Sequence, residues 1–125
     1  MAWISGWLIG WSGTVSEVAE FTEWFGKTLK KQPCKPPKDV GWTNMMAMVV
    51  SPGGDVYEYR NNTMPFRCHA KYYAIGSGSD FALGAMAHGA TAYEAVIAAI
   101  AHDVNSGIPI IEMEWKPPKK TRRRK

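Results

Sequence analysis

The sequence predicts a small α+β domain, in which most strands follow one another along the chain and two helices are consecutive. Three observations indicate this class. Several short segments alternate apolar and polar residues with period two, one long segment has helical period, and an Ala-rich pair of helical segments comes later. The 125 residues suffice for one core, and the 46% apolar content excludes a disordered chain.

The first element is predicted to be a single strand over residues 3–11, where the side chains alternate between two faces. Trp3, Trp7 and Trp11 then fall on one face. Burial against a second layer explains these rings better than a platform for single-stranded nucleic acid, because no cation is interleaved with them.

A helix is predicted next. Thr14 and Glu17 have the spacing of a capping box, and apolar residues then recur with helical spacing over residues 15–29. Lys30 and Lys31 follow at the end where the helix dipole favours cations. Residues 32–39 contain three prolines, so we expect an irregular connector there.

A β-hairpin is predicted in the middle of the chain. The apolar run 44–50 and the alternating run 56–60 are separated by the turn sequence Ser-Pro-Gly-Gly-Asp at 51–55. Residues 61–67 are predicted to form a polar loop and residues 71–75 a further strand.

Two helices and a last strand complete the prediction. The first helix covers residues 80–88, and a capping box formed by Thr91 and Glu94 opens the second, over residues 92–102. Residues 108–115 are predicted to be the final strand.

Charge divides the chain into a domain over residues 1–115 and a tail over residues 116–125, which we expect to be disordered. The tail holds seven of the 15 basic residues and no acid, so the domain itself is net acidic. A basic tail of this kind contacts nucleic-acid phosphates or an acidic partner. The candidate contact residues are Lys119, Lys120, Arg122, Arg123, Arg124 and Lys125.

The sequence contains little that indicates a bound cofactor or a metal ion. The turn Gly76–Gly78 resembles an anion-binding glycine turn, but a dinucleotide fingerprint needs a third glycine where Phe81 stands. His69 beside Cys68 has no second pair at ligand spacing. We therefore expect no cofactor and no metal.

The two cysteines, Cys34 and Cys68, are expected to be free thiols. The apolar opening of the chain lacks a basic region, and glycines interrupt it, so it is too short to cross a bilayer and does not resemble an export signal. We expect a cytoplasmic protein with no membrane contact.

The stretch from residue 71 onward resembles the proteasome β-subunits and the HslV-type peptidases, a branch of the N-terminal-nucleophile hydrolases. Two of its motifs carry the resemblance: Ala-Ile-Gly-Ser-Gly at 74–78, and Asp-x-x-Ser-Gly at 103–107 before a strand. Residues 8–14 look like the family's strand that ends in glycine before its first long helix.

The resemblance implies an incomplete αββα two-sheet sandwich of the N-terminal-nucleophile hydrolase type. It also implies site residues. Gly13 matches the glycine whose N–H forms the oxyanion hole. Ser77, Asp103 and Ser106 match residues that orient the nucleophile and its amine, and Gly78 belongs to the same motif.

The family's catalytic Thr, Asp and Lys lie on two strands that would precede Met1. We therefore expect a truncated, catalytically inactive proteasome-like protein that acts by protein binding, through a homo-oligomer or another protein that covers the exposed sheet. Such a product would suit a viral gene that modulates a host protein. The alternatives are a threonine peptidase whose first strands lie upstream or in another chain, and a nucleic-acid-associated protein that binds through its tail.

Overall fold

The computed structural model describes residues 2–70 and 72–102, and these form one antiparallel sheet and three α-helices. The sheet order is β1-β2-β3-β4-β5, so every strand pairs with its neighbours along the chain. The helix α1 lies between β2 and β3 in the chain, and α2 and α3 follow β5. The bounds of the strands are Ala2–Ile4, Trp7–Gly13, Met45–Val50, Val56–Arg60 and Phe66–Cys68. The α-helices are Val15–Lys27, Ser79–Ala87 and Ala92–His102, and a short 3-10 turn, η1, spans Leu29–Lys31.

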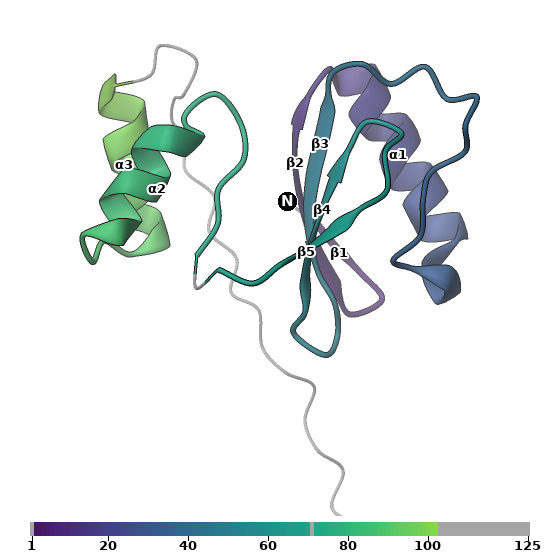
Figure 1. Cartoon of the computed structure of the whole chain (residues 1–125), viewed down its shortest axis with the longest axis horizontal. Helices are drawn as coiled ribbons and strands as arrows, with labels where there is room; N and C mark the ends of the chain where they lie inside the picture. Colours follow the sequence, from purple (N-terminus) through teal and green to yellow (C-terminus); the bar gives the residue numbers. More distant parts are fainter. Residues whose placement is uncertain (1, 71, 103–125) are drawn as a thin grey trace, which may run out of the picture.

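The elements are arranged in three layers. Helix α1 covers one face of the sheet, and the α2–α3 hairpin lies on the other side, as Figure 1 shows with the sheet seen nearly edge-on. The predicted α+β class is confirmed. Among the described residues there is a single sheet, so the second sheet that the resemblance implies is not seen in this part of the chain.

The core lies between α1 and the sheet, and aromatic rings dominate it. Phe21 and Phe25 of α1 are completely buried against Tyr59 of β4, with ring centroids 5.2 Å and 5.8 Å from it. Trp42 covers one side and donates its indole N–H to the Glu20 carboxylate at 2.8 Å. The edge-to-face contacts of Phe21 and Phe25 with Tyr59 stabilise the core in addition to the burial of apolar area.

The single strand predicted over residues 3–11 is wrong, because the chain turns at Ser5 and Gly6 to form the β1–β2 hairpin. Both turn residues have positive φ, 45° and 88°, as a tight two-residue hairpin requires. Trp3 pairs with Leu8, and Ile4 pairs with Trp7. Paired residues share a face, so Trp3 lies on the opposite face from Trp7.

The first predicted capping box does not form, although the helix that it predicts does. Thr14 occupies the N-cap of α1 without a side-chain cap bond, and its hydroxyl accepts a hydrogen bond from the Asn44 side chain. Glu17 instead accepts from the backbone N–H groups of Thr43 and Asn44. Hydrogen bonds between the start of α1 and residues 43–44, directly before β3, replace the predicted capping box.

The second predicted capping box is confirmed at the start of α3. The Thr91 hydroxyl accepts from the Glu94 backbone N–H at 3.2 Å, and the Glu94 carboxylate accepts from the Thr91 backbone N–H at 2.9 Å. Two N–H groups that the helix leaves without intrahelical partners are satisfied in this way.

Two predictions between β4 and α2 are wrong. The loop predicted over residues 61–67 contains the start of β5, whose Phe66 pairs with Glu58. The strand predicted over residues 71–75 is absent, since Tyr72–Ile75 has no regular structure. The short strand β5, directly after Pro65, occupies the edge of the sheet next to β4 in place of the predicted strand.

Candidate functional site

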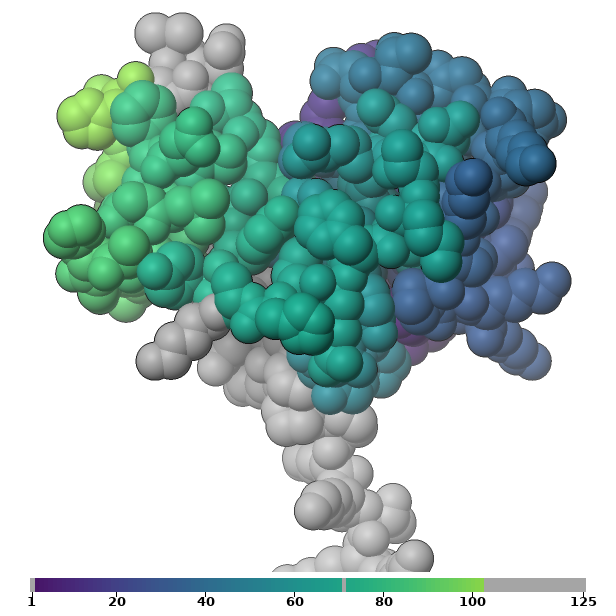
Figure 2. All heavy atoms as spheres, viewed as in Figure 1, coloured from purple at the N-terminus to yellow at the C-terminus, as the bar shows by residue number. Residues whose placement is uncertain are grey.

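A cavity of about 570 Å³ separates the sheet from the α2–α3 hairpin. Figure 2 shows a notch between the mass of atoms that belongs to this hairpin and the mass formed by the sheet and α1. The cavity is bounded by β2, β3, the segment before α2, and both helices of the hairpin. Its side chains include Leu8, Met48, Tyr73, Ala82, Met86, Tyr93 and Val96.

The sheet forms one wall because its strands alternate. Ile9 and Val49 are fully buried and face α1, whereas Leu8 and Met48 face the cavity. Trp3 shares the cavity-side face with Leu8, and 43% of Trp3 is exposed. A large apolar side chain therefore stands unburied beside the wall.

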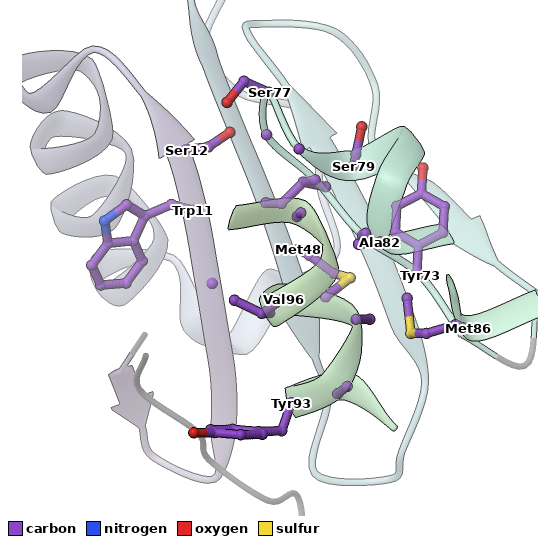
Figure 3. A pocket seen from close by; sticks show the side chains of 18 of the residues that line it. Trp11, Ser12, Met48, Tyr73, Ser77, Ser79, Ala82, Met86, Tyr93 and Val96 are labelled. Carbon is purple, nitrogen blue, oxygen red and sulfur yellow. The ribbon is translucent and has the colours of Figure 1, made fainter. Parts of the chain in front are cut away.

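The helical hairpin forms the opposite wall. Ala82 of α2 packs against Ala95 and Ala99 of α3, and these small residues let the two helices approach closely. Val96 projects from α3 toward the sheet, as Figure 3 shows, and 38% of it is exposed. Both walls are apolar, and the described side chains form two separate cores, one under α1 and one between α2 and α3.

Serine hydroxyls and glycines gather at one end of the cavity. Ser12 and Ser77 point toward one another there (Figure 3), and a β-carbon on Gly76 would lie 3.7 Å from the Ser12 β-carbon. Gly13 directly follows Ser12, and Gly78 is the N-cap of α2. Two of the five family-matched residues, Ser77 and Gly78, thus line this end, and a third, Gly13, adjoins it in the chain.

The remaining family-matched residues, Asp103 and Ser106, lie outside the described residues, as do the predicted strand 108–115 and the basic tail. Within residues 2–70 and 72–102 no cluster of three or more His, Cys, Asp or Glu side chains is close enough to hold a metal ion. Cys34 and Cys68 are free thiols. No helix in the part of the chain that the structure describes is long and apolar enough to cross a membrane.

A buried polar cluster beside the cavity is a feature that the sequence did not predict. Glu58 of β4 is 1% exposed, and its Oε1 accepts a hydrogen bond from the Tyr73 hydroxyl at 2.8 Å. Burial and this bond to the carboxylate raise the pKa of Tyr73 to about 12. Burial, followed by the nearby Glu58 charge, also raises the pKa of the Cys68 thiol. Cys68 is therefore a poor nucleophile at neutral pH.

Comparisons with known proteins give a likeness in fold. No family model matches the sequence, and no curated protein matches it significantly. A solved structure, Thiobacillus denitrificans BPH, matches with a TM-score of 0.63 over 91% of this chain and 78% of that chain. The two chains share a fold. Their sequence identity is 20%, so the likeness concerns the fold alone.

Proposed function

We propose that this chain is a catalytically silent, proteasome-like protein, and that it works by binding another polypeptide between its sheet and its α2–α3 hairpin. In this proposal the partner covers the cavity-side face of the sheet, as the second sheet of an αββα sandwich would. The motifs at residues 74–78 and 103–107 support the family assignment.

The observation that carries the binding proposal is the apolar cavity itself. Two apolar walls of described residues face each other across this cavity, and Trp3 is exposed on the same face of the sheet. When another polypeptide covers exposed apolar surface, that surface is removed from water and the free energy of the complex falls. We propose a second copy of this chain as the partner, which would supply further strands.

The described lining of the cavity is mostly apolar. Its polar side chains are the hydroxyls of Ser12, Tyr73, Ser77, Ser79 and Tyr93. An apolar surface with a few hydroxyl groups is suited to binding a polypeptide.

Sedimentation of the purified chain tests this proposal. We expect a mass above that of a single chain at micromolar concentration. Val96→Asp places a charge in the cavity and should return the protein to monomers, whereas Ile97→Asp is the matched control. Ile97 is 47% exposed on the same helix and does not line the cavity. A monomeric wild-type chain, or equal effects of the two variants, would contradict self-association.

The runner-up is a threonine peptidase in which another polypeptide supplies the nucleophile. The placement of Ser12 and Ser77 at one end of the cavity favours it over other enzymes, because Ser77 is a family-matched residue and Ser12 directly precedes the glycine that matches the oxyanion hole. Hydrolysis of a fluorogenic peptide that appears only when a strand-supplying polypeptide is added to the purified chain, and that Ser77→Ala abolishes, would favour this reading over the silent one.

A further inference from the structure

Glu58 is a carboxylate in a place that disfavours charge. It lies in the middle of β4, on the same side of the sheet as the cavity, with Met48 and Phe66 as its partners on either side. Only 1% of it is exposed. A buried carboxylate is costly unless hydrogen bonds compensate for its lost hydration.

The two carboxylate oxygens of Glu58 are compensated unequally for their lost hydration. Oε1 accepts from the Tyr73 hydroxyl, whereas Oε2 has no hydrogen-bond partner among the described residues. The Arg60 guanidinium stands 3.6 Å from Oε2, but the Arg60 side chain is 58% exposed, so solvent weakens this attraction. The Tyr73 bond therefore carries most of the compensation.

Tyr73 belongs to the irregular segment that joins β5 to α2 and leads directly into the turn at Gly76. Because the described side chains of the sheet and of the α2–α3 hairpin form separate cores, this segment is the covalent connection between them along the described chain. The Tyr73–Glu58 bond fixes the segment to the sheet a few residues before α2 begins.

We propose that Glu58 and Tyr73 form a latch that positions the α2–α3 hairpin over the sheet and so sets the width of the cavity. Glu58 acts through Tyr73, as a positioning residue. The latch concerns the single folded chain, so it holds whether or not a second copy enters the cavity.

Amide hydrogen exchange of the full-length chain tests the latch, at a concentration low enough for monomers. Tyr73→Phe removes only the hydroxyl. We expect exchange to rise about tenfold in residues 79–102 and to stay unchanged in β2 and β3, because only the opening of the hairpin becomes easier. Tyr72→Phe is the matched control, since Tyr72 is the exposed neighbour in the same segment.

Glu58→Gln supplies a second variant. Its amide oxygen still accepts from Tyr73, so exchange in the hairpin should rise less than in Tyr73→Phe. The latch is refuted if Tyr73→Phe and Tyr72→Phe behave alike. It is also refuted if Tyr73→Phe raises exchange equally in the sheet and in the hairpin, since that is a general loss of stability.

Discussion

The carbonyl oxygen of Asn44 lies 2.0 Å from the position that a β-carbon on Gly13 would occupy. Gly13 has a φ of +117°, so the backbone also disfavours any side chain there. The same Asn44 oxygen accepts a hydrogen bond from the Thr14 N–H at 2.8 Å. Strand β2 thus ends in contact with the start of β3, at the point where α1 begins.

Gly13→Ala should therefore destabilise the protein, by about 3 kcal/mol, because backbone strain and a backbone clash act together. Gly26→Ala is the matched control. No atom lies within 4 Å of a β-carbon at Gly26, which is in α1, and alanine there should stabilise the protein by about 0.5–1 kcal/mol. Urea unfolding measures both changes, and a destabilisation of the same size in the two variants would contradict the contact.

The hydrogen bonds of Glu17 predict that the free energy of unfolding falls at acidic pH. Desolvation raises its pKa, but the hydrogen bonds from the backbone N–H groups of Asn44 and Thr43 outweigh it and leave the pKa below its ordinary value. A lowered folded-state pKa means that the stabilisation is present above the unfolded-state pKa and is lost as the pH falls through the folded-state pKa.

Glu17→Gln should therefore reduce the difference in unfolding free energy between neutral and acidic pH. Urea unfolding at a series of pH values measures this difference. Glu23 of α1 is the comparison for an exposed carboxylate, because its hydrogen bond and ion pair with the Lys27 side chain, and no backbone N–H group, lower its pKa. If Glu17→Gln leaves the pH profile unchanged, the two backbone bonds do not form in solution.

Thr91→Ala should weaken the start of α3 by about 1 kcal/mol, because the helix loses its N-cap hydroxyl. Hydrogen exchange in residues 92–96 reports this change locally. Thr91→Ser keeps the hydroxyl and should behave like the wild-type chain. Equal exchange in the alanine and serine variants would mean that the capping box does not stabilise α3.

Trp3→Ser should weaken self-association about tenfold, since exposed tryptophans often dominate the energy of an interface. Val15→Ser is the control, because Val15 is 84% exposed at the start of α1, on the other side of the sheet. Dilution series followed by sedimentation velocity give both dissociation constants. If the Trp3 variant associates as tightly as the Val15 variant, Trp3 does not belong to the interface.

The elements with a strong local signal were predictable from the sequence. The turn at residues 51–55 fixed the β3–β4 hairpin, and helical spacing of apolar residues located α1 within two residues at its end. The alanine-rich segments similarly became α2 and α3. In each case the signal lies within a few residues, so no distant contact was needed to interpret it.

Features that depend on distant contacts were not predictable in this way. Trp3 changed face because Ser5 and Gly6 form a tight turn, although a Ser-Gly pair between two apolar runs is a recognisable hairpin signal. Glu58 alternates with Tyr57 and Tyr59, which suggests a solvent-facing carboxylate. It is buried because Tyr73 folds back onto it, and nothing near residue 58 in the sequence indicates that.

Hydrogen exchange measured at low and at high protein concentration tests the binding role of the cavity most directly. If a second copy fills the cavity, amides of β2 and of residues 79–102 become protected as the concentration rises, while those of α1 do not change. Protection that is the same at both concentrations in every segment would show that this cavity stays open, and the proposed role would be wrong.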